Sequence, residues 1–198
     1  MVKKKEKEAK LKLLHRLLIS YLDFQQAWWI ASYIIKHKFQ EKTEKLQGKR
    51  RYHIKLLWEA LNCAMIISYC RPFSGNDRNS TNRIPNLPER FLKILTNKEK
   101  ELHSILMKER NTILAHSDSD AWELQTYFLE VNKNQKMLIP SHTYTRSPLT
   151  HKIVEQIRTM INKLMESVFK ERMKIEKELE NDLPSVSISE LIRIKNDI

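Results

Sequence analysis

The stretch AWWIASYII (residues 27–35) is apolar on nearly every side of a helix. A helix with this pattern lies at the centre of a folded domain, because no polar face remains for water. Residues 9–46 around it keep helical spacing, and we expect a break near Tyr21–Asp23. Gly48 is expected to end the element, since glycine commonly follows the last helical residue. The stretch therefore predicts a helical core.

Further segments continue the helical pattern: residues 50–70, a short helix at 88–95, then 97–116 and 148–181. Thr96 followed by Glu99 matches a capping box at the start of 97–116. Ser147-Pro148 matches a helix start, with proline at the first helical position. The chain has only 2 glycines, which argues against glycine-rich phosphate loops and tight-turned all-β folds.

Residues 117–147 interrupt the helices. Apolar residues there alternate with Thr and Val, and a polar turn at Asn132–Gln135 separates two runs, which predicts a β-hairpin. We therefore expect an all-α fold, an antiparallel bundle of four to five long helices with this small β insertion. Residues 1–182 are predicted to form one domain, and residues 183–198 a loosely packed tail.

The chain is strongly basic, with a formal net charge of +12 and a pI of about 9.7. The excess of positive charge is concentrated in residues 1–20 and 36–55. A polyanion such as nucleic acid is the natural partner, and a solvated basic surface is the alternative. The only two cysteines, Cys63 and Cys70, show no disulfide framework, which favours a reducing cytoplasm. No apolar run reaches about 18 residues, so we expect no membrane association.

The residues with the clearest chemistry are RNTILAH (110–116). Arg110 carries a permanent charge and a planar fork that suits phosphate oxygens. His116 can exchange a proton near neutral pH, and Asn111 adds an amide beside them. These groups suit chemistry on a phosphodiester. The alternative is a surface ion pair for Arg110 and a cation favoured by the helix C-terminus for His116.

The motif consists of an arginine, a polar residue directly after it, and a histidine after four further residues. It resembles the motif of the HEPN superfamily (higher eukaryotes and prokaryotes nucleotide-binding). The architecture expected for residues 9–181 is similar to that family's small helical bundle. Many members are metal-independent endoribonucleases of toxin–antitoxin, abortive-infection and CRISPR systems. One branch has a tyrosine two residues after the histidine that becomes modified. This chain has Asp118 there, so we do not expect that regulation.

The resemblance implies catalysis without a metal or cofactor, through the 2′-hydroxyl of RNA. His116 would act as the acid or base, Arg110 would clamp the phosphoryl oxygens, and Asn111 would orient His116 or hold the phosphate. Glu109 and Asp118 are candidates for supporting roles. A metal site at His116, Asp118 and Asp120 is disfavoured, because no distant ligand has suitable spacing.

One straight helix does not bring Arg110 and His116 together. Six residues correspond to about 600° of rotation, roughly 120° short of two turns, and to a rise of about 9 Å. The two side chains would meet in a distorted helix end or across the two-fold axis of a homodimer. Arg146 and His151 repeat the spacing, but they span the predicted start of a helix, so we reject that pair.

The loop at residues 71–86 carries basic residues and one aromatic residue, which suit a phosphate backbone and a stacked base. Trp122 is a candidate for the same RNA surface, whereas Trp28, Trp29 and Trp58 are expected in the core. The alternative for the loop is a solvated connector. The loop candidates are Arg71, Phe73, Arg78 and Arg83.

The sequence thus favours an endoribonuclease of a toxin or anti-phage defence system, with RNA as its substrate and a cognate antitoxin or defence protein as a further partner. The main alternative is a non-catalytic basic helical module that binds RNA or a partner protein. A regulatory subunit of a toxin–antitoxin pair is a third hypothesis.

Overall fold

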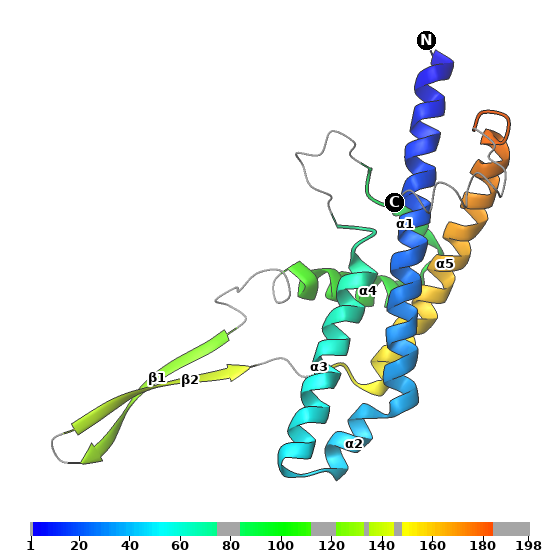
Figure 1. Ribbon diagram of the computed structural model, residues 1–198. Helices are drawn as coiled ribbons and strands as arrows, with labels where there is room; N and C mark the ends of the chain where they lie inside the picture. The colour runs from blue at the N-terminus through cyan, green and yellow to red at the C-terminus, as the bar shows by residue number, and fades with distance from the viewer. Residues whose placement is uncertain (1, 75–83, 112–121, 133–134, 145–147, 184–198) are drawn as a thin grey trace, which may run out of the picture.

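In the computed structural model, residues 2–74, 84–111, 122–132, 135–144 and 148–183 are described (Figure 1). The elements in chain order are α1 (Val2–His37), α2 (Phe39–Lys45), α3 (Gly48–Cys70), the 3₁₀-helix η1 (Glu89–Ile94), α4 (Asn97–Glu109), β1 (Trp122–Asn132), β2 (Gln135–Tyr144) and α5 (His151–Leu179). The expected fold class is confirmed: helices pack together, and a two-stranded hairpin separates α4 from α5.

The long helices pack along α1, which runs antiparallel to both α3 and α5, while α4 lies across α3 and α5 (Figure 1). One face of α5 is fully buried, and its apolar residues recur with helical spacing. They share one core cluster with buried residues of α1, including Leu17, Phe24 and Ile34. The buried residues of that α5 face are Val154, Ile157, Met160, Ile161, Leu164 and Val168.

The expected break near Tyr21–Asp23 is wrong, because α1 continues through it. Buried Leu17, Ser20 and Phe24 keep helical spacing on both sides of that point. The chain bends instead at Lys38, which has a φ of 49° and separates α1 from α2. Gly48 does not end the first helical segment as expected, but begins α3 with a φ of 58°, a conformation that glycine adopts freely.

The all-round burial expected for residues 27–35 is also wrong. Ala27, Ala31 and Ile34 are buried, whereas Trp29 is 60% exposed. The reason is that α3 and α5 cover one side of α1 and leave the opposite side in water. Trp58 is buried as expected.

Hydrogen bonds decide where α4 and α5 begin. The predicted capping box of Thr96 and Glu99 is present, and both of its reciprocal bonds form. The expected start of the last helix at Ser147-Pro148 is wrong, since α5 begins at His151. The N–H of Leu149 donates to Asn62 Oδ1 at 3.2 Å, and the N–H of His151 donates to Gln40 Oε1 at 3.1 Å. These side chains of α3 and α2 therefore hold the chain just before the helix.

The hairpin projects away from the bundle (Figure 1). Its strands are antiparallel, and Asn132 pairs with Gln135 at the ends of the predicted turn, whose two central residues lie outside the described ranges. Six of its large apolar side chains are exposed: Tyr127, Phe128, Leu129, Val131, Met137 and Leu138. Within the described ranges, no helix is long and apolar enough to cross a membrane.

The left-handed conformation of Lys38 gives a test of the bend between α1 and α2. Residues other than glycine are strained at this φ, so Lys38→Gly should raise the free energy of unfolding by about 0.5–1 kcal/mol. Lys36→Gly, inside α1, should lower it, because glycine disfavours a helix interior. Urea unfolding of both variants checks this, and destabilisation by Lys38→Gly would contradict the assigned bend.

Candidate functional site

The first two residues of the Arg-Asn-x4-His motif lie at the end of α4. The helix is regular to Glu109, and Arg110 keeps α-helical backbone angles (φ −59°, ψ −44°), with its N–H donating to the carbonyl oxygens of Leu106 and Met107. A π-helical pattern is assigned to Arg110 and Asn111. Turns of this kind inside α-helices are frequent at functional sites. Arg110 is partly buried, and its Nη1 donates to Asn111 Oδ1 at 2.9 Å in an exposed contact. Asn111 therefore orients the fork of the arginine next to it.

His116 and Asp118 lie outside the described residues. The convergence of Arg110 with His116 and a supporting role for Asp118 stay predictions. Whether the two side chains meet through a distorted helix end or across a two-fold axis stays a prediction, since residues 112–116 lie outside the described part of the chain. Glu109 is half-buried at the last regular position of α4, and its role in orienting His116 also stays a prediction.

The charge of Arg110 acts on the end of α3. Burial raises the pKa of the Cys70 thiol to about 12, with Arg110 opposing the rise and Glu109 adding to it. The thiol of Cys70 lies 3.5 Å from the carbonyl oxygen of Leu106, to which it donates. Glu109 and Arg110 therefore lie near the contact between α3 and α4, and Cys70 serves this contact as a buried neutral thiol.

Arg71, the residue after α3, is held by α1. Its Nη1 donates to Asp23 Oδ1 at 3.4 Å and to Gln26 Oε1 at 3.3 Å, while about half of its side chain stays exposed. Burial raises the pKa of Asp23, and the nearby Arg71 and Arg16 oppose that rise. This contact gives Arg71 a structural role, and RNA binding by it stays a prediction. Arg78 and Arg83 lie outside the described residues.

Phe73 packs among aromatic rings inside the molecule. Its ring centroid lies 4.7 Å from that of His103, and 5.8 Å from those of Phe24 and Tyr69. This packing accounts for Phe73 without a stacked base, so base stacking stays a prediction. Trp122 opens β1, and its side chain lies outside the described part of the chain.

Two basic side chains inside the molecule, His103 and Arg16, were not predicted from the sequence. The His103 ring is half-buried, and its Nδ1 lies 2.8 Å from the Tyr69 hydroxyl. Burial lowers the pKa of His103. Its signal was the spacing of seven residues from Arg110, which places both on one face of α4, about 10.5 Å apart along the axis. Because Nδ1 bonds Tyr69 and Phe73 packs on the ring edge, His103 belongs to the packing of α3 on α4.

The second is Arg16, which is only 2% exposed. Its Nε donates to the carbonyl oxygen of Pro85, and burial lowers the pKa of the guanidinium while Asp23 opposes this. The bond ties the segment before η1 to α1. A basic residue between buried Leu14 and Leu17 was the available signal.

Among the described residues, no three His, Cys, Asp or Glu side chains are placed to hold a metal ion. The His116, Asp118 and Asp120 cluster weighed above lies outside them. Comparison of the chain with models of known families, with curated proteins and with solved structures gave no match. Any function of this chain must therefore be inferred from its own residues and their geometry.

The lowered pKa of His103 predicts a pH dependence of stability. The unfolded chain, with an ordinary histidine pKa of 6.5, binds the proton more readily than the folded protein. The free energy of unfolding should therefore fall as the pH drops below about 6.5. His103→Gln should flatten this fall, whereas His15→Gln, at an exposed position of α1, should leave it unchanged. Urea unfolding at a series of pH values measures it, and parallel curves for His103→Gln and the unaltered protein would exclude this origin.

Proposed function

We propose that this protein is a metal-independent endoribonuclease of the cytoplasm, acting in a toxin or anti-phage defence system. The observation that carries the proposal is Arg110 at the end of α4, hydrogen-bonded through its guanidinium to Asn111 and opening the Arg-Asn-x4-His motif. The helical bundle and the resemblance of the motif to HEPN nucleases support it.

The chemistry uses the nucleophile that RNA carries beside each phosphate. The 2′-oxygen forms a bond to phosphorus while the bond from phosphorus to the 5′-oxygen breaks, which leaves a 2′,3′-cyclic phosphate and a 5′-hydroxyl. Neutral His116 accepts the 2′-hydroxyl proton, and a protonated imidazole donates one to the leaving oxygen. Arg110 stabilises the charge that develops on the phosphoryl oxygens. Two copies of His116 in a homodimer would supply both protonation states.

A cluster of exposed cations where α1, α2 and α3 meet supports RNA binding. These six side chains form no ion pair with any residue in the described ranges, whereas Lys7 and Lys10 near the start of α1 pair with Asp182 and Glu178. Unpaired cations retain their full attraction for a phosphate backbone. The six residues are Lys36, Lys42, Lys45, Lys49, Arg50 and Arg51.

This cluster also favours the second candidate, a non-catalytic module that binds RNA, since it acts without the motif. The two candidates differ in one respect, which is whether the bound RNA is cleaved. A cognate antitoxin or defence protein remains part of the proposal, with no described surface assigned to it.

The homodimer is proposed to form through the hairpins. A lone two-stranded hairpin is marginally stable, and its two unpaired edges invite another strand. Tyr127 and Leu129 point to one face and Phe128 to the other, so both faces present apolar groups. Residues 122–144 contain two lysines and two glutamates, so their formal charge is zero within a chain of +12. Hairpins of two copies can therefore meet without charge repulsion, and a symmetric contact closes at two chains.

The nuclease prediction concerns Arg110 and His116. With a metal chelator present, the protein should cleave single-stranded RNA to products ending in 2′,3′-cyclic phosphate. Arg110→Ala and His116→Ala should each reduce the rate by roughly a hundredfold or more, since each removes acid–base or charge-stabilising catalysis. Gel analysis and mass spectrometry of the products measure this.

His151→Ala is the matched control, because this histidine of the rejected pair lies at the start of α5 beside Glu155, at 3.4 Å. It should cleave at the normal rate. Cleavage that persists in both motif variants, or that requires Mg²⁺, would refute the nuclease. RNA binding without cleavage, weakened steeply by salt, would favour the non-catalytic module.

The dimer prediction compares two leucines of similar exposure, Leu129 on the hairpin at 50% and Leu56 on α3 at 52%. Leu129→Glu should shift the protein from dimer to monomer, because it places a charge in the apolar contact, whereas Leu56→Glu should not. Sedimentation equilibrium measures the mass. A monomeric unaltered protein, or a dimer lost only in Leu56→Glu, would exclude the hairpin contact.

A further inference from the structure

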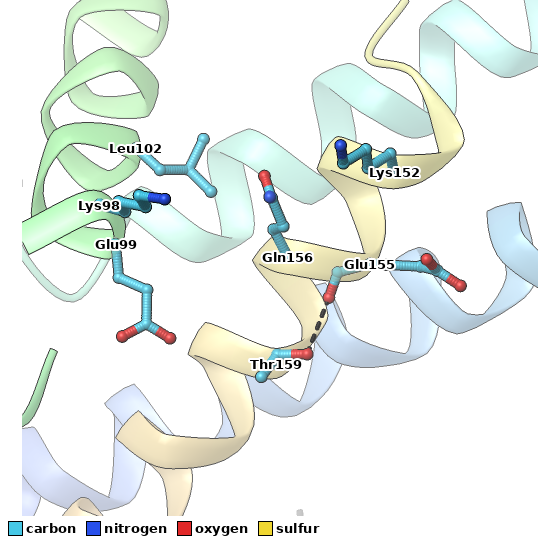
Figure 2. A pocket seen from close by; sticks show the side chains of 7 residues that line it. All are labelled: Lys98, Glu99, Leu102, Lys152, Glu155, Gln156 and Thr159. Carbon is cyan, nitrogen blue, oxygen red and sulfur yellow. Dashed lines mark hydrogen bonds between the residues drawn. The ribbon is translucent and has the colours of Figure 1, made fainter. Parts of the chain in front are cut away.

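A pocket of about 400 Å³ lies between α4 and α5, near the first turn of each helix (Figure 2). Neither Arg110 nor Asn111 lines it. Its lining combines both signs of charge with one aliphatic side chain: Lys98, Glu99 and Leu102 of α4, and Lys152, Glu155, Gln156 and Thr159 of α5.

The acidic groups of the pocket are occupied elsewhere. Glu99 accepts a hydrogen bond from Lys163 Nζ at 2.7 Å and others from the N–H and hydroxyl of Thr96 at 2.8 and 3.0 Å. Glu155 lies 3.4 Å from His151 Nε2. Figure 2 shows both carboxylates turned away from the space between Lys98 and Lys152. The carboxylate of Glu99 is thus paired with the Lys163 ammonium group, and that of Glu155 points away from both pocket lysines.

The two lysines face each other without a partner. The ammonium group of neither Lys98 nor Lys152 forms a hydrogen bond or ion pair with any group in the part of the chain that the structure describes. In Figure 2 their ammonium groups extend toward one another from α4 and α5, and the Gln156 amide lies between them. Two positive charges and an amide thus point into one space beside Leu102.

We propose that this pocket binds a phosphate monoester. Such a group carries about −1.5 to −2 charges at pH 7, which matches two ammonium groups, whereas a carboxylate or a phosphodiester carries about −1. Lysine binds phosphate as a point charge, and the Gln156 amide can donate a further bond. The volume lies within the range of about 300–1,000 Å³ found for small-molecule sites. The aliphatic chain of Leu102 offers an apolar contact for the attached nucleoside.

The phosphate monoester has two sources, a free nucleotide or the 5′-phosphorylated end of an RNA strand. Both present the same group to Lys98 and Lys152. The site stands on its own contacts and does not depend on the nuclease activity proposed for the Arg110 motif.

Isothermal titration calorimetry with the full chain tests the proposal. The probes are adenosine 5′-monophosphate, adenosine, and a 2′-O-methyl oligoribonucleotide with or without a 5′-phosphate, so that no cleavage occurs. We expect at least one phosphorylated probe to bind more tightly than its unphosphorylated counterpart. Preference for the nucleotide identifies a free ligand, and preference for the phosphorylated strand identifies an RNA end.

Lys98→Ala and Lys152→Ala should each weaken that binding by about tenfold, since each removes a charged hydrogen bond. Lys170→Ala is the charge-matched control, because Lys170 is exposed on α5, pairs with no described residue and does not line the pocket. It should weaken binding less than twofold. Circular dichroism and thermal melting establish that the variants fold.

Equal binding of phosphorylated and unphosphorylated probes would overturn the site, as would no binding of either phosphorylated probe. An equal loss in Lys170→Ala would also overturn it, because the attraction would then come from the diffuse charge of the chain. Failure of RNA cleavage would leave these measurements unaffected, so the two proposals fail separately.

Discussion

The apolar contact of α1 with α3 and α5, called the seam below, is the contact on which the other elements depend. Leu17, Phe24 and Ile34 of α1 share one core cluster with the buried face of α5, and α3 packs along the same helix. Each buried side chain of this size contributes about 1.5–3 kcal/mol relative to exposure, so the seam supplies a large favourable term. Because it covers only one side of α1, Trp29 on the other side remains in water.

Polar contacts then fix the positions of the connecting segments, which the apolar packing along α1 does not determine. Arg16 ties the segment before η1 to α1, and Asn62 and Gln40 hold the chain where α5 begins. The Tyr69–His103 contact joins α3 to α4 inside the aromatic cluster around Phe73. A buried polar group is costly without a partner, so these contacts allow few alternative arrangements.

The features that suggest function lie outside this rigid centre. The π-helical turn at Arg110, the cation cluster where α1 meets α2 and α3, the lysine pocket and the hairpin each present groups that the fold itself does not use. Binding and catalytic residues commonly occupy such positions on a packed scaffold. The phosphate site is separate from the nuclease, since it depends on different residues, whereas the hairpin dimer would supply the second copy of His116 that the nuclease chemistry uses.

Local interactions were readable from the sequence because they join residues close in the chain. The capping box at Thr96, the turn between the two strands and the apolar face of α5 each follow from neighbours within about one helical turn or one hairpin. The same holds for the helix that carries Arg110. For the candidate site, the sequence supplied the motif but not its surroundings.

Tertiary structure alone decided what depends on partners distant in the chain. It moved the start of α5 to His151, because Gln40 and Asn62 lie 111 and 87 residues away from the groups they accept. It placed Arg71 within hydrogen-bonding distance of Asp23 in α1. It also paired Glu99 with Lys163 and brought Lys98 and Lys152 to the lining of one pocket. The sequence determined the helices, the hairpin and the motif through short-range geometry. Packing decided which charged side chains found partners within the described residues and which did not, because that depends on distances between helices.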